Sequence, residues 1–127
     1  MRFAKYEGIG NDFVMLADPD DRRPLTPAIV RRLCDRRFGI GGDGVIRVVR
    51  RSGGADFFMD YVNSDGSIGE MCGNGIRCLA AFVRAEGLTD ATTMEVDTRA
   101  GVKTVEIVGD DVRVDMGAPM FEPALVP

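Results

Sequence analysis

The chain has 127 residues, of which 45% are hydrophobic and 28% charged, a composition typical of one globular domain that excludes a disordered or fibrous protein. Sixteen basic and twenty acidic residues give a formal net charge of −4, which argues against a nucleic acid as partner. No apolar stretch approaches the roughly 20 residues that cross a bilayer and the N-terminus lacks a secretory signal, so we expect a cytoplasmic protein without membrane contact.

Two short strands are expected first, at 2–6 and 13–17, separated by a glycine-containing turn. A helix follows, because Thr26 is a good N-cap and Pro27 suits the first helical position. Gly39 is expected to end this helix. The first third of the chain therefore predicts a strand pair and an amphipathic helix with an arginine-rich face.

The middle of the chain is predicted to form a hairpin and then a second helix. Strands at 45–51 and 56–62 flank a glycine-containing loop, which is typical of an antiparallel pair. The helix is expected from about Asn74 to Glu86, with Gly87 ending it. Apolar residues occur on almost all its sides, so we expect it to be buried nearly all round, as a helix wrapped by a sheet would be.

Three more strands, at about 92–98, 102–108 and 112–116, alternate in a way that predicts an antiparallel meander. The fold class is therefore α+β, a mixed and largely antiparallel sheet wrapped around one central buried helix. All of residues 1–127 are expected to form a single lobe. The segment 117–127, with three prolines, looks like a linker into further sequence.

The side chains available for chemistry are limited. Histidine is absent, which removes the commonest general base and the commonest transition-metal ligand. The three cysteines, Cys34, Cys72 and Cys78, are odd in number and lack zinc-site spacing, so we expect neither a disulfide framework nor a metal site. Cys34 and Cys78 fall inside predicted helices and are expected to be structural.

The most informative stretch is 70–78, EMCGNGIRC, in which Cys72 stands just before two glycines and the start of the second predicted helix. The unpaired N–H groups and positive dipole end of a helix N-terminus favour a thiolate over a thiol. Gly73 and Gly75 leave the backbone bare enough for a ligand carboxylate to approach those amides. This arrangement suits removal of a proton from the carbon next to a carboxylate. The alternative is that Cys72 is a small buried hydrophobe.

Other polar segments give weaker signals. Asn11 could offer its amide as both donor and acceptor to a zwitterionic ligand. The segment 39–44 superficially matches a dinucleotide fingerprint, but it follows a helix and precedes a strand, the reverse of the required order. Asp43 within it and the turn at 63–66 are interpreted as turn formers.

Taken together, these segments resemble diaminopimelate epimerase, the pyridoxal-independent enzyme that interconverts LL- and meso-diaminopimelate on the route to lysine. Four stretches are similar to successive family motifs in order and spacing: 5–13 (KYEGIGNDF), 36–44 (RRFGIGGDG), 63–67 (NSDGS) and 70–78 (EMCGNGIRC). The later strands also fit the family's first lobe. The resemblance spans essentially the whole chain, but only the first half of a family member.

The resemblance implies two similar lobes, with the substrate in the cleft between them and one cysteine from each lobe. One thiolate removes the α-proton while the opposite thiol protonates the other face, and Cys72 would be the first-lobe member of this pair. It further implies substrate contacts by Asn11 and Asn63, by the backbone of Gly73 and by the amide of Asn74. It implies no metal and no organic cofactor.

The chain departs from the family pattern at three points. Gly44 stands where some members have a glutamine that touches substrate, so no binding side chain is assigned there, and Glu7 replaces a common histidine. No second Cys-Gly-Ser/Thr-Gly motif follows Cys78. We therefore expect the N-terminal lobe of an epimerase, inactive by itself, whose partner is the missing C-terminal lobe or, in a homodimer, a second copy of the chain.

Two other classes of function stay open, a non-catalytic ligand-binding lobe and a thiol redox sensor built on Cys72. Protection of Cys72 by diaminopimelate against alkylation would distinguish them from the epimerase. A fold-sharing phenazine-pathway enzyme is a further possibility, although its usual pattern lacks a cysteine here. The sequence leaves open the oligomeric state and the reason that the chain ends at Pro127.

Overall fold

The computed structural model describes residues 2–8, 10–51, 54–69, 73–109 and 111–115. Along these ranges the elements are β1 (Arg2–Gly8), β2 (Asn11–Ala17), α1 (Pro27–Cys34), β3 (Gly44–Arg50), β4 (Phe57–Asn63), α2 (Gly73–Ala85), β5 (Thr93–Thr98), β6 (Gly101–Val108) and β7 (Asp111–Asp115). The strands form one sheet in chain order, with β2–β3 and β4–β5 parallel and the other pairs antiparallel. The predicted mixed, largely antiparallel α+β sheet is confirmed.

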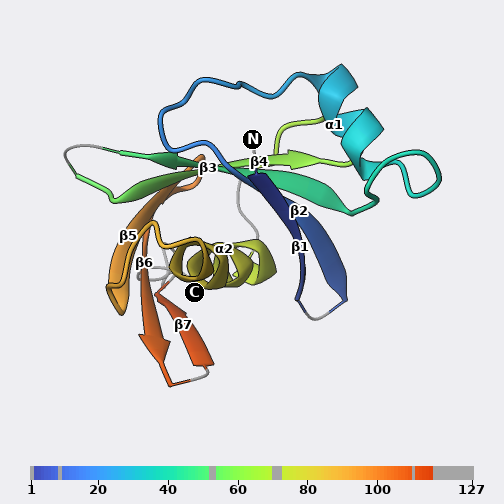
Figure 1. Cartoon of the computed structure of the whole chain (residues 1–127). Coiled ribbons are helices and arrows are strands. Elements are labelled where there is room, and N and C mark those ends of the chain that lie inside the picture. The colour runs from blue at the N-terminus through green and yellow to red at the C-terminus, as the bar shows by residue number, and fades with distance from the viewer. Residues whose placement is uncertain (1, 9, 52–53, 70–72, 110, 116–127) are drawn as a thin grey trace, which may run out of the picture.

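The sheet curls around α2 and carries α1 on its outer side (Figure 1). Successive side chains of a strand point to opposite faces, so β2 contributes Phe13 and Met15 to the core around α2 and Val14 and Leu16 to the core under α1. Parallel neighbours need a crossover connection, and the two helices lie in the two crossovers. One crossover therefore covers the outer face and the other fills the inside.

The burial of α2 differs from the prediction. Its apolar side is buried, but Arg77, Ala81, Arg84 and Ala85 are exposed and form one stripe along the helix. The edge strands β1 and β7 both contact α2 without pairing with each other, so the sheet leaves one side of the helix uncovered. The expectation of burial nearly all round was therefore wrong for this stripe. Neither described helix is long and apolar enough to cross a membrane.

The end of α1 also differs from the prediction, because the helix ends at Cys34 and not at Gly39. Asp35 leaves the helical conformation, with φ −63° and ψ 119°. Its carboxylate accepts the backbone N–H groups of Arg37 (2.8 Å) and Phe38 (3.1 Å), which holds the following residues in a turn. A local side-chain hydrogen bond thus stops the helix before the glycine is reached.

The β1–β2 hairpin is tighter than expected. The strands continue to Gly8 and from Asn11, which face each other in the register, whereas the sequence predicted a longer turn between 2–6 and 13–17. Gly10 adopts φ 79°, a conformation that L side chains rarely tolerate. The tight turn places Asn11 at the end of the sheet.

A buried group of charges on the outer face was not predicted. Arg47 on β3, only 7% exposed, donates from Nε to Asp60 on β4 (2.9 Å) and from Nη1 to Asp18 (2.8 Å) and Asp21 (2.7 Å). Arg99, in the β5–β6 turn, donates from Nη2 to the other oxygen of Asp60 (2.6 Å). These ion pairs tie the central strands to the loop before α1 and to the β5–β6 turn.

Candidate active site

One end of the sheet gathers those described residues to which the resemblance assigns substrate contacts. Phe13 pairs with Gly44, and Gly44 pairs with Asn63, so the start of β2, the start of β3 and the end of β4 lie side by side. The N-terminus of α2 reaches the same end, as the contact between Asn74 and Asn11 shows. We call this end the rim and define it by residues 10–12, 42–44, 63–69 and 73–75.

The two asparagines Asn11 and Asn74 are in direct contact, although they are 63 positions apart in the sequence. Nδ2 of Asn74 donates a hydrogen bond to Oδ1 of Asn11 over 3.2 Å. The bond joins the first turn of α2 to the first residue of β2. Two of the four described residues to which the resemblance assigns substrate contacts are therefore brought together.

Gly73 is the first residue of α2, one position earlier than the sequence predicted. A Cβ placed on it would meet no atom of the described residues within 4 Å, so its surroundings are open within that part of the chain. The first amides of a helix have no partner within the helix and carry the positive end of its dipole. The helix begins here with an accessible backbone that suits the approach of an anionic group.

Asn63 lies at the same rim but is held in its own turn. Its Nδ2 donates to Oγ of Ser67 (3.1 Å), and its backbone N–H donates to the Ser67 carbonyl oxygen (2.8 Å). Oγ (2.6 Å) and the backbone N–H (2.9 Å) of Ser67 in turn donate to Oδ1 of Asp65, and these two bonds lower the pKa of the Asp65 carboxyl. Asn63 therefore has a fixed place at the end of β4. It is connected to the segment that carries Asn11 through the backbone of the next residue, Ser64.

Asp43 provides that link. Its carboxylate Oδ2 accepts the backbone N–H of Asp12 (2.9 Å), and its own N–H donates to the Asp12 carbonyl oxygen (2.8 Å). The N–H of Ser64 donates to the carbonyl oxygen of Asp43 (3.0 Å). The sequence predicts only a turn-forming role for Asp43, yet this residue bonds the residues that follow Asn11 and Asn63.

Arg36 neutralises the acids at this end of the lobe. It binds the Asp12 carboxylate with both terminal nitrogens (2.8 and 2.9 Å) and reaches Oδ1 of Asp43 (3.2 Å), while Lys5 contacts Asp12 from the other side (3.1 Å). The guanidinium of Arg36 holds the pKa of the Asp12 carboxyl well below its ordinary value. A polar hollow of about 340 Å³ opens here, lined by Glu7, Gly10, Asn11, Asp12, Arg36 and Asp43.

The ring of Tyr61 fills the space in front of Gly44. A Cβ on Gly44 would lie 2.7 Å from Cε1 of Tyr61, and one on Gly69 would lie closer still to the same ring. Phe13 packs edge-on against Tyr61, with ring centroids 5.9 Å apart. The space that a side chain at position 44 would need is thus occupied by an aromatic ring from β4.

Cys72, the predicted catalytic thiol, lies outside the described residues, as do residues 70 and 71. The described residues on either side belong to the rim: Gly69 is buried and donates its N–H to the Tyr61 carbonyl oxygen (3.0 Å), and Gly73 begins α2. Cys34 and Cys78 are both buried. Within the described ranges, no three acidic or cysteine side chains are grouped so that they could hold a metal ion.

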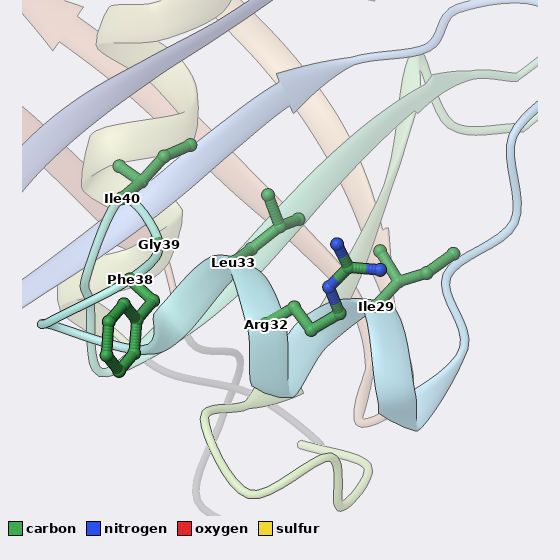
Figure 2. Close-up of a pocket in the computed structure, with 6 residues that line it drawn as sticks. All are labelled: Ile29, Arg32, Leu33, Phe38, Gly39 and Ile40. Carbon is green, nitrogen blue, oxygen red and sulfur yellow. The ribbon is translucent and has the colours of Figure 1, made fainter.

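A larger and more apolar hollow, of about 390 Å³, lies elsewhere. Figure 2 shows that its lining comes from α1 and the loop after it: Ile29, Arg32, Leu33, Phe38, Gly39 and Ile40. It lies on the outer side of the sheet and includes none of the residues to which the sequence assigns a site role. The candidate site is therefore the rim.

The family model named diaminopimelate epimerase matches residues 3–122. The chain belongs to the diaminopimelate epimerase family. Two curated relatives of that name are those of Corynebacterium glutamicum, 48% identical over 92% of this chain and 47% of the relative, and of Synechocystis sp., 46% identical over 100% of this chain and 46% of the relative. The chain thus spans about half the length of the epimerases that it matches.

Solved structures show the same fold at low sequence identity. A phenazine biosynthesis protein of the PhzF family from Bacillus anthracis matches with a TM-score of 0.64 and 21% identity, over 88% of this chain and 37% of that one. A methylitaconate-delta-isomerase matches with a TM-score of 0.60 and 16% identity, over 86% and 35%. The chain therefore shares its α+β architecture with proteins of other names.

Proposed function

We propose that this chain is the first lobe of a diaminopimelate epimerase and supplies Cys72 as one of the two thiols that invert the α-carbon of diaminopimelate. The observation that carries the proposal is the hydrogen bond from Asn74 to Asn11 beside the open backbone of Gly73. It places amide groups next to the start of α2, and Cys72 immediately precedes Gly73 in the sequence. The alternatives stay a non-catalytic binding lobe and a redox sensor.

The proposed chemistry is proton transfer without metal or pyridoxal. The thiolate of Cys72 takes the α-proton, and the thiol of the opposite cysteine donates a proton to the other face of the carbon, so charge and protons balance. Helix amides at Gly73 and Asn74 stabilise negative charge on the thiolate and on the substrate carboxylate. The amides of Asn11 and Asn63 can donate to a carboxylate and accept from an ammonium group.

The proposal requires a second lobe. Among the described residues the rim is open on the side of Gly73, and proton abstraction from an amino acid is efficient only when water is excluded from the thiolate. Since the chain spans about half of its relatives, a C-terminal lobe that closes over the rim is the proposed partner, and a second copy of this chain is the lesser one. The isolated chain is then inactive, and the reaction belongs in the cytoplasm.

A chimera tests the proposal directly. Residues 1–127 replace the matching half of the Corynebacterium glutamicum epimerase, and exchange of the α-proton of LL-diaminopimelate with deuterated water is followed by NMR, together with formation of the meso isomer. We expect both from the chimera and neither from the isolated chain. A cooperatively folded chimera that leaves the substrate unchanged would overturn the proposal, as would full turnover by the isolated chain.

Two cysteine variants of the chimera separate chemistry from packing. Cys72→Ala is expected to abolish exchange, whereas Cys78→Ala, which shortens a buried side chain on α2, costs stability and leaves turnover within about threefold. Equal losses of activity from both variants would contradict the assigned role of Cys72.

Alkylation of the isolated chain distinguishes the alternatives. The rate of Cys72 modification is measured against pH with and without diaminopimelate. A thiol that is reactive below its ordinary pKa and protected by diaminopimelate supports the epimerase. Reactivity without protection supports the redox sensor, and an inert thiol contradicts any chemical role.

A further inference from the structure

We infer that Asp43 is a positioning residue, which fixes Asn11 and Asn63 at the separation that substrate binding requires. This inference rests on the proposed function. Asp43 does not touch the substrate itself; it acts through the backbone of the two segments that carry the asparagines.

Three hydrogen bonds carry the inference. Two of them join Asp43 to Asp12, the residue after Asn11, through the Asp12 N–H (2.9 Å) and the Asp12 carbonyl oxygen (2.8 Å). The third joins the Asp43 carbonyl oxygen to the N–H of Ser64, the residue after Asn63 (3.0 Å). A single residue thus links the start of β2 to the turn after β4, which lie about fifty positions apart in the sequence.

The carboxylate of Asp43 has a defined orientation. Oδ2 accepts the Asp12 N–H, while Oδ1 accepts from Nη2 of Arg36 (3.2 Å), and Arg36 also holds the Asp12 carboxylate with two bonds. Charge-assisted bonds with two-point geometry resist rotation more than a single neutral bond does. Asp12 is therefore held through both its backbone and its side chain, and Asn11 is held with it.

The lobe contains a matched control at its other end. Asp56 makes the same two bonds to Glu95: its N–H donates to the Glu95 carbonyl oxygen (2.8 Å), and its Oδ2 accepts the Glu95 N–H (2.8 Å). Asp56 precedes β4 whereas Asn63 ends it, and seven strand residues span about 20 Å. Replacing Asp56 removes the same kind of bond far from the rim.

The test compares Asp43→Ala, Asp43→Asn and Asp56→Ala in the chimera with diaminopimelate as substrate. We expect Asp43→Ala to raise KM at least tenfold with a smaller change in kcat, and Asp43→Asn, which retains an acceptor oxygen, to recover part of that loss. For Asp56→Ala we expect both KM and kcat to stay within twofold of the values of the unsubstituted chimera. In an Asn11→Ala background, Asp43→Ala is expected to raise KM by less than threefold further, because the Asp43 side chain acts through Asn11.

A second readout uses the isolated chain and needs no turnover. The side-chain amide signals of Asn11 are compared by NMR among the three variants, because only the link to Asp12 runs through the side chain of Asp43. We expect them to shift in both Asp43 variants and to stay unchanged in Asp56→Ala. Unshifted signals in Asp43→Asn, or kinetic parameters of Asp43→Ala equal to those of Asp56→Ala, would overturn the inference. Inactivity of the folded, unsubstituted chimera would instead overturn the proposed function.

Discussion

The ring of Tyr61 on β4 lies so close to the backbone of Gly44 on β3 that Gly44 has no room for a Cβ. Such an atom would lie 2.7 Å from Cε1 of Tyr61 and 2.9 Å from the carbonyl oxygen of Val62. The ring is also packed edge-on against Phe13 and covers Gly69. Tyr61 therefore lines the rim, and its ring leaves room only for a glycine at position 44.

We expect Gly44→Ala to lower the free energy of unfolding by about 1–3 kcal/mol, because the added methyl group overpacks against both a ring and a backbone oxygen. Urea denaturation measures this loss. In a Tyr61→Leu background the loss is smaller, although the contact with the Val62 oxygen remains. An unchanged denaturation midpoint for Gly44→Ala would contradict the packing described here.

Gly73→Ala is expected to separate folding from binding. No atom of the described residues lies within 4 Å of the added Cβ, and alanine favours a helix over glycine by up to about 1 kcal/mol, so stability is unchanged or slightly higher. If the substrate approaches the α2 N-terminus, the methyl group obstructs it, and KM of the chimera for diaminopimelate rises severalfold. A chimera with unchanged KM would exclude close contact between Gly73 and the substrate.

Arg47→Ala is expected to destabilise the lobe by about 3 kcal/mol, because it removes the guanidinium that pairs with the buried carboxylates of Asp18 and Asp60, while Arg99 and two backbone N–H groups still bind them. Urea denaturation with an unchanged slope measures the loss. Arg51→Ala is the control: its exposed pair with Asp97, at 3.7 Å, is expected to contribute less than about 1 kcal/mol. Similar losses from both arginines would contradict the importance of the buried cluster.

Stability is expected to fall in acid, below about pH 4. Arg36 lowers the pKa of Asp12; burial raises that of Asp18, but two backbone N–H groups and Arg47 outweigh it and lower the pKa overall. A carboxyl whose pKa is lower in the folded state contributes its stabilisation above the unfolded pKa and loses it as the pH falls through the folded one. Urea midpoints between pH 7 and pH 3 measure the slope.

The arginine that causes part of this slope can be removed. Arg36→Gln is expected to make the acid dependence less steep, since Asp12 then titrates nearer its unfolded pKa. Arg37→Gln is the control, because the guanidinium of Arg37 lies over the ring of Phe38 instead. An equal change of slope in both variants would show that general charge, and not the contact with Asp12, is responsible.

Local signals in the sequence predicted most of the elements. Thr26 accepts the N–H of Ile29 (3.2 Å) as the N-cap of α1, and Pro27 is its first residue. The hairpin of β3 and β4 and the meander of β5 to β7 follow from alternation and glycine turns. The end of α1 was not predicted correctly. The carboxylate of Asp35 accepts two backbone N–H groups and ends the helix before Gly39, the residue expected to end it.

Contacts between distant residues could not be predicted from local pattern. Arg36 and Asp12 are 24 positions apart, and Asp43 and Asp12 are 31 apart, so only the fold brings them together. A charged residue such as Arg47 on a strand usually indicates a solvent-facing position, yet it lies buried under a loop. The resemblance to the family suggested roles for Asn11 and Asn74; their contact with substrate stays a prediction, as does the role of Cys72.

The order of the strands in the sheet is also their order of synthesis. Each strand can therefore pair with its predecessor as the nascent chain leaves the ribosome, without waiting for a distant partner. Helix α2, in contrast, must wait for part of its packing, because it is synthesised before β5, β6 and β7 and packs against the last two. A chain arrested near residue 90 would expose the apolar side of α2 that later packs against β6 and β7. Chaperones should therefore recognise the incompletely synthesised lobe at this stage in particular.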